Sequence, residues 1–136
     1  MKYEFFEHTS DAKFRAYGKN LEECFSNAAE AMTSIMINPE KVEQIITKSV
    51  QVKGRDLKQL LSQFLEEILF LLDTENFILH KVSSIKINPV GKEYYLSATL
   101  LGDKIDEKYE IQGGIKAVTY MDMEVKENYV QVVVDI

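Results

Sequence analysis

This sequence contains no tryptophan and little cysteine, proline and histidine. Cys24 is the only cysteine, so no disulfide forms within the chain and a reducing compartment is favoured. His8 and His80 are the only histidines, which argues against a zinc site built from several histidines. Charges interrupt every apolar stretch, and the opening segment MKYEFFEHTSD turns polar too early for a secretory signal. We therefore expect a cytoplasmic protein that makes no contact with membranes.

Most sequence signatures of enzymes are also absent. The chain contains no glycine-rich phosphate loop, GxSxG elbow, CxxC pair or HExxH helix. Gly113 and Gly114 lack the strand-to-helix context of a nucleotide fingerprint. Cys24 falls on the apolar stripe of a predicted helix, which is typical of a buried, unreactive thiol. These absences favour a protein without catalysis of its own.

Size and charge restrict the remaining classes. The chain has 136 residues, of which 46% are hydrophobic and 28% charged, as expected for one domain spanning residues 1–136. The net charge is −6 and the pI is near 5.0. Strong binding to a phosphate backbone depends on Lys and Arg displacing counterions, and an acidic chain is poorly suited to it. If the protein acts on RNA, we expect another protein to hold that RNA.

The hydrophobic pattern predicts two helices and a set of strands. Residues 21–36 and 57–72 repeat apolar side chains at i, i+3, i+4 and i+7, and Asn20 and Asp56 are suitable N-caps. Strands are predicted at 2–8, 12–18, 43–53, 78–88, 93–101, 105–112, 116–125 and 128–136. No helix separates the later strands, which favours antiparallel pairing. We expect an α+β fold with two amphipathic helices packed on one face of a largely antiparallel β-sheet.

Acidic residues near the two ends of the chain are the candidates for chemistry. Asp11 follows a turn at the start of a predicted strand, and Asp135 precedes Ile136, whose α-carboxylate adds a charge. If these groups converge, a hard divalent cation would relieve their repulsion, whereas the alternative is two solvated surface aspartates. Lys116 is either an exposed lysine at a strand edge or a partner of this cluster or of a phosphate.

Several segments resemble the archease family in order and spacing. They are His8–Asp11 (HTSD), the helix entry GKNL at 18–21, the helix LKQLLSQFLEEILFLLD, the KAVTY segment from Lys116 to Tyr120, and the closing valine-rich strand with Asp135. Archeases commonly have tryptophan where this chain has Phe64, and histidine where it has Met121. Because Met121 alternates onto the face of Ala117 and Thr119, we expect it in the core and leave it out of the site.

The resemblance implies a function that composition does not give. Archeases are accessory proteins of RtcB-type RNA ligases, which act in tRNA splicing and RNA repair, and they promote GTP-dependent guanylylation of the ligase and multiple turnover. The implied metal site is Asp11, Asp135 and Ile136 with Ca²⁺, Mg²⁺ or Mn²⁺, and Lys116 is its implied functional neighbour. His8 is more easily explained by positioning the 9–11 turn than as a ligand. RNA would be contacted mainly through the ligase.

Two other functions remain open from the residues alone. The same carboxylates suit a small metal-dependent phosphoester hydrolase, although no general acid is evident. A general chaperone or RNA-binding module is the second, and the acidic pI argues against its RNA-binding form. The sequence does not indicate an oligomeric state.

Overall fold

The computed structural model describes residues 1–136 as helices α1 (Leu21–Ser34) and α2 (Leu57–Glu75), a short 3₁₀ helix η1 (Pro39–Lys41) and seven strands. The strands are β1 (Tyr3–Phe6), β2 (Asp11–Tyr17), β3 (Ile46–Gly54), β4 (Phe77–Val90), β5 (Glu93–Lys104), β6 (Ala117–Val125) and β7 (Tyr129–Asp135). Both predicted helices are confirmed, with Asn20 and Asp56 accepting hydrogen bonds from the backbone N–H groups of Glu23 and Gln59. Neither helix is long and apolar enough to cross a bilayer.

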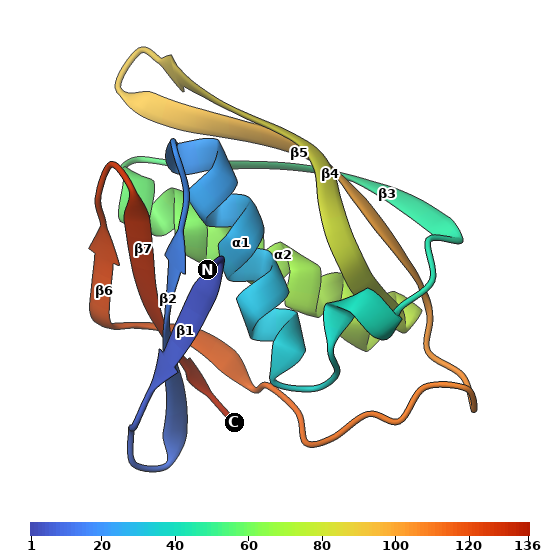
Figure 1. Cartoon of the computed structure of the whole chain (residues 1–136). Coiled ribbons are helices and arrows are strands. Elements are labelled where there is room, and N and C mark those ends of the chain that lie inside the picture. The colour runs from blue at the N-terminus through green and yellow to red at the C-terminus, as the bar shows by residue number, and fades with distance from the viewer.

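The strands form two antiparallel sheets. Sheet A has the order β1-β2-β7-β6 and sheet B the order β3-β5-β4. The two helices lie between the sheets, and each contacts strands of both (Figure 1). The predicted α+β class, with two helices packed on antiparallel strands, is confirmed. The structure differs from the expectation in dividing the strands between two sheets. Two covering sheets are possible because the buried residues of α2 occupy a broad arc rather than one narrow stripe.

The main core fills the space between the sheets around the helices. Phe25 of α1 and Phe64 of α2 stack with ring centroids 6.3 Å apart, and both are fully buried. Sheet A contributes alternate residues of β7, including Val132 and Val134. Sheet B contributes Leu100 of β5 and its neighbours on the same face. Because side chains alternate across a strand, the intervening residues of sheet A lie on its outer face. Both candidate aspartates are among these outer residues.

The predicted strand at 105–112 is wrong, because these residues form a loop. The side chains of Ile105, Tyr109 and Ile111 are partly buried against a small apolar cluster at the end of α1. This cluster consists of Met36, Ile37, Val42 and Ile78. Asp103, only 5% exposed, accepts hydrogen bonds from the Tyr109 hydroxyl at 2.6 Å and the Lys108 ammonium at 2.9 Å. The alternating apolar residues therefore cover a helix end instead of pairing in a sheet.

Candidate metal centre

The end of sheet A brings the two candidate aspartates together. Strands β2 and β7 pair so that Asp11 lies directly opposite Asp135, and Ala117 of β6 lies on the other side of Asp135. Cross-strand partners share a face of the sheet, with Cβ atoms about 4.5–5.5 Å apart. The neighbouring Val134 is fully buried on the inner face, so the two carboxylates lie on the outer face, adjacent to Ile136. Convergence of the two strand ends is as expected, while metal binding there stays a prediction.

His8 holds Asp11 in place from the preceding turn. The turn contains Ser10 in the left-handed region, with φ of 68°, and brings Nδ1 of His8 into contact with Oδ1 of Asp11. The Asp11 side chain is only 12% exposed as a result, whereas Asp135 is exposed. The imidazole contacts Oδ1 of this carboxylate. The contact orients Asp11 within the turn, and the part of His8 in metal binding stays a prediction.

Lys116 lies beside the same end of the sheet through its backbone. Its N–H donates a hydrogen bond of 2.7 Å to the carbonyl of Asp135, which extends the β6–β7 pairing by one residue. Its side chain is exposed to solvent. The backbone position fits a neighbour of the acidic cluster, and the exposed ammonium remains available to an anionic group.

Asp122 joins this region although sequence reasoning missed it. Four residues of β6, 120–123, stand against the single residue Val132 of β7, and Asp122 has φ of 51° within this bulge. The bulge directs its carboxylate to Lys13 Nζ, at 3.4 Å, and to within 4.0 Å of His8 Nε2. A strand predicted from regular alternation gives no signal for such a displacement.

The same bulge corrects the expectation for Met121. Its side chain is 53% exposed and not part of the core, while Met123, at 4% exposed, occupies the core position. The extra residues of the bulge shift the alternation by which Met121 was assigned to the buried face. Met121 and the equally exposed Tyr120 therefore stand out from the surface next to Asp122.

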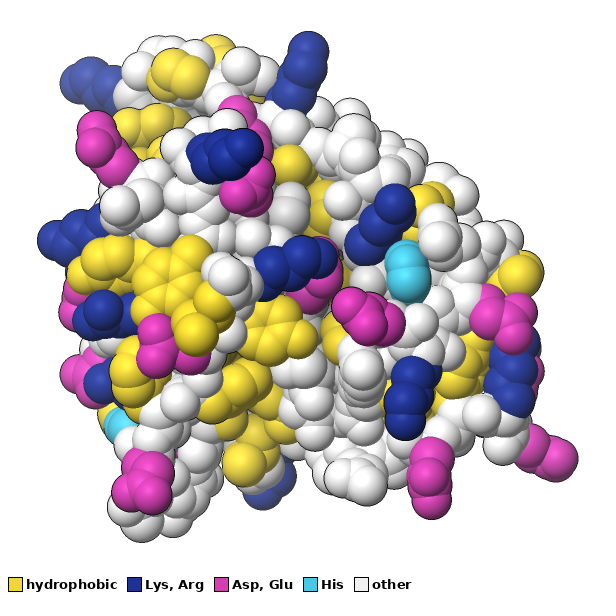
Figure 2. All heavy atoms as spheres, in the orientation of Figure 1, with side chains coloured by type: hydrophobic (Ala, Val, Ile, Leu, Met, Phe, Trp, Pro, Cys, Tyr) yellow, Lys and Arg dark blue, Asp and Glu magenta, His cyan; other side chains and the backbone are white.

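A network of polar and aromatic side chains orders the rest of this outer face. The guanidinium of Arg15 lies 4.4 Å from the ring centroid of Tyr129, and its Nε–H donates to Gln131 at 2.9 Å. The Tyr129 hydroxyl donates to Glu124 at 2.5 Å. This bond lowers the pKa of the Glu124 carboxyl below its usual range and raises that of the Tyr129 hydroxyl. Figure 2 shows hydrophobic side chains gathered over sheet A, at the left of the view, with charged groups between them.

The oxygen atoms at the tip are the kind of ligand that a hard divalent cation prefers. No group of three or more His, Cys, Asp or Glu side chains converges closely enough to hold a metal ion. The candidate set is therefore two carboxylates, Asp11 and Asp135, supplemented by the main-chain oxygen of Ile136 and by water. Oxygen donors of this kind suit Ca²⁺, Mg²⁺ or Mn²⁺, and the set contains no thiolate for a softer metal.

Fold and site together define a small α+β protein with helices between two antiparallel sheets and an acidic tip on one of them. The family model of the archease protein family matches residues 3–136. Proteins named archease from Pyrococcus abyssi and Methanothermobacter thermautotrophicus are 39% and 41% identical to this chain. Those matches cover 93% and 90% of this chain and 89% and 87% of theirs. The chain belongs to the archease family.

Solved structures agree with this assignment. The solution structure of protein 1598 from Methanobacterium thermoautotrophicum covers 99% of both chains, with a TM-score of 0.83 and 33% sequence identity. The crystal structure of an archease from Thermotoga maritima has a TM-score of 0.52 and 17% identity, over 96% of this chain and 94% of its own. The second likeness shows a shared fold at a distance where the sequences have diverged.

Proposed function

We propose that this chain, as a single archease domain, is a non-catalytic activator of an RtcB-type RNA ligase. It promotes GTP-dependent guanylylation of the ligase and multiple turnover in tRNA splicing and RNA repair. Membership of the archease family supports the proposal, with relatives 39% and 41% identical over most of their length. The RNA is contacted mainly through the ligase. A lone, buried Cys24 suits the reducing cytoplasm, which is the proposed location.

The observation that carries the proposal is the register that sets Asp11 opposite Asp135 at the end of sheet A. In the proposed site, these carboxylates and the main-chain oxygen of Ile136 hold a divalent cation. The cation, when bound, supplies positive charge that offsets the negative charge of a triphosphate. His8 fixes the orientation of Asp11 through its Nδ1 contact. The exposed ammonium of Lys116 adds a second positive group for phosphate oxygens.

The test follows the ligase–guanylate adduct over time with the cognate ligase, GTP and limiting Mn²⁺. Asp11→Asn and Asp135→Asn each remove one carboxylate at nearly constant volume. Asp73→Asn, at an exposed position of α2, is the matched control for the change in net charge. We expect native protein and the control to accelerate adduct formation, and both tip variants to lose more than about tenfold of that acceleration.

Binding of Mn²⁺ to the protein alone, followed by electron paramagnetic resonance, gives a readout independent of activity. Binding should be lost in Asp11→Asn and Asp135→Asn and retained in Asp73→Asn. Full acceleration by both tip variants would remove the metal from the mechanism. No acceleration by native protein would overturn the activator proposal. Phosphoester turnover by the protein alone, abolished in Asp135→Asn, would replace it by the hydrolase alternative.

A further inference from the structure

The outer face of sheet B differs in charge from the chain as a whole. We define this face as the outward-pointing residues of 47–53 in β3, 81–88 in β4 and 95–101 in β5, which alternate with core residues. It carries three exposed lysines, Lys53, Lys81 and Lys86, and no acidic side chain, in a chain of net charge −6. Carboxylates occur only at its ends, where Glu93 lies in the hairpin and the buried Asp103 pairs with Lys108.

Apart from Leu101, the remaining side chains of this face are hydrogen-bonding groups. Hydroxyls predominate and are supplied by Thr47, Ser49, Ser83, Ser84, Ser97 and Thr99. A hydroxyl donates to a phosphate oxygen and also accepts from a ribose hydroxyl. Together with the lysines, these groups make the face complementary to a polyanion whose backbone also bears hydroxyls.

A hollow of about 780 Å³ lies toward the hairpin end of the face. Its lining includes Gln51, Lys53, Asn88 and Tyr95 of this face, together with Gln59 and Gln63 of α2 and one carboxylate, that of Glu93. The ring of Tyr95 is 41% exposed and offers an aromatic surface on which a base can stack. The amides of Gln51 and Asn88 each provide a donor and an acceptor for the edge of such a base.

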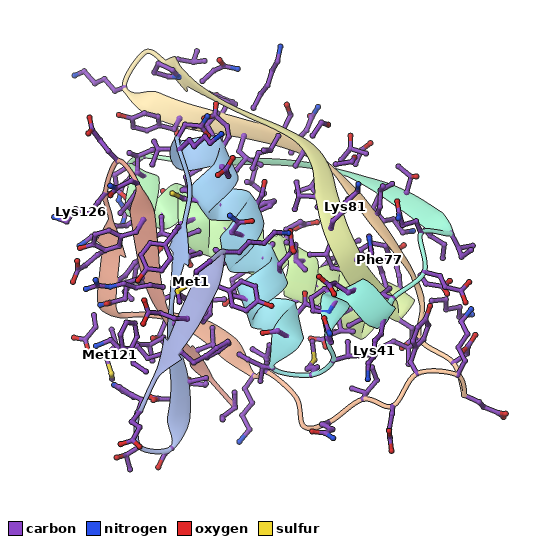
Figure 3. The ribbon with its side chains drawn as sticks, in the orientation of Figure 1. Met1, Lys41, Phe77, Lys81, Met121 and Lys126 are labelled. Atoms are coloured by element: carbon purple, nitrogen blue, oxygen red, sulfur yellow. The ribbon has the colours of Figure 1, made fainter.

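We propose that the outer face of sheet B binds single-stranded RNA, with phosphates on Lys53, Lys81 and Lys86 and a base on Tyr95. The choice of RNA among polyanions rests on the proposed function, whereas the binding itself needs no ligase. Sheet B lies across the helix layer from sheet A (Figure 1), and Figure 3 shows Lys81 beside β4, right of centre, and Met121 at the left, beside β6. The face is therefore accessible while the acidic tip is engaged.

The expected contact is weak and sensitive to salt. Three lysines that contact phosphates of single-stranded RNA give a slope of about −2 for log K against log salt concentration. The net negative charge of the chain opposes binding further. Removing two lysines should reduce that slope by about 1.4. Loss of the Tyr95 ring should weaken binding by roughly five- to a hundredfold without changing the slope.

The experiment measures fluorescence anisotropy of a labelled oligouridylate of about 12 nucleotides, titrated at several salt concentrations with the protein alone. The variants are Lys81→Gln/Lys86→Gln and Tyr95→Leu, with thermal melts to verify folding. Lys2→Gln/Lys126→Gln is the matched control, since Lys2 pairs with Glu30 of α1 and Lys126 lies in the β6–β7 turn. Polyglutamate serves as a competitor of equal charge.

We expect both test variants to bind more weakly than native protein and the control to bind as native protein does. Equal loss in the control would show that net charge, and not this face, governs binding and would overturn the proposal. Unchanged binding by Tyr95→Leu with full competition by polyglutamate would assign the face to acidic proteins instead. Ligase guanylylation, measured with the same variants, separates the two proposals. If native protein does not accelerate guanylylation, the activator proposal fails. The RNA titration tests the proposal for sheet B.

Discussion

Replacing Asp103 by asparagine removes the negative charge around which residues 105–112 are held, while it keeps the size of the side chain. The carboxylate accepts three hydrogen bonds, from the Tyr109 hydroxyl at 2.6 Å, the Lys108 ammonium at 2.9 Å and the Lys104 N–H at 2.8 Å. The amide oxygen of asparagine can keep the bond from Lys104. Its NH₂ group then faces the Lys108 ammonium, which can only donate, and the Tyr109 hydroxyl, which can accept from it only by giving up its own donation, so both bonds to a charged acceptor are lost.

The bond from Tyr109 dominates the expected cost, because the carboxylate that accepts it is buried. A hydrogen bond to a buried charged group contributes about 2 kcal/mol. Lys108 is 43% exposed, and solvent screening leaves it a minor contributor. For a chain of this length, a loss of about 2 kcal/mol lowers Tm by about 7 °C. Tyr109→Phe removes the same bond from the other side, so the double variant should cost less than the two single variants added together.

The pH dependence identifies the charge as the cause. Tyr109 and Lys108 lower the pKa of the folded Asp103 carboxyl below its ordinary value of 3.8. A depressed folded pKa gives stability that is present above the unfolded pKa and is lost as pH falls through the folded pKa. The Tm difference between native protein and Asp103→Asn, followed by circular dichroism, should be full at pH 7 and narrower by about pH 3. An equal difference at both pH values would refute this explanation, as would strict additivity in the double variant.

Two further predictions concern the core. Gly102→Ala should destabilise the fold by about 3 kcal/mol in chemical denaturation, because a Cβ there would lie 2.0 Å from the Ile78 carbonyl oxygen, whereas Gly114→Ala, where a Cβ meets nothing within 4 Å, is the neutral control. Similar stability of the two variants would contradict this packing. Cys24 is fully buried and burial raises the pKa of its thiol, so labelling by Ellman's reagent should be at least about a hundredfold slower in native than in denatured protein. Rapid labelling of the folded chain would contradict its burial.

The features that could be predicted from the sequence are the local ones. Both helices depend on apolar side chains at i, i+3 and i+4 and on a cap that bonds to a residue three positions further on. Both helices are present, with Asn20 and Asp56 as their N-caps. Most strands follow from alternation for the same reason. Apolar and polar residues alternate in the segment 105–112 too, but its apolar side chains pack against the cluster at the end of α1 and the segment pairs with no strand. Alternation reports which residues are buried and does not report what buries them.

Features that depend on contacts between distant segments could not be predicted from the hydrophobic pattern. Division of the strands into two sheets depends on how wide an apolar arc each helix presents to its surroundings. The bulge of β6, which exposes Met121 and directs Asp122 toward His8 and Lys13, depends on pairing with β7. In the candidate site, Asp11 and Asp135 stood out at the ends of predicted strands, but their assignment to a metal site came from the resemblance to the archease family. Asp122 could not be named, because only the register of the assembled sheet brings it there.

The two proposals together would let an acidic chain act beside RNA. A chain of net charge −6 with uniform charge would be repelled by RNA held on a ligase. Here the carboxylates of the proposed metal tip lie on sheet A, while the lysines of the proposed RNA face lie on sheet B, and the helix layer separates them (Figure 1). A contact through only three lysines would be weak, which suits the multiple turnover of the proposed ligase activation. Because no residue belongs to both faces, substitutions on one face can be tested without changing the other.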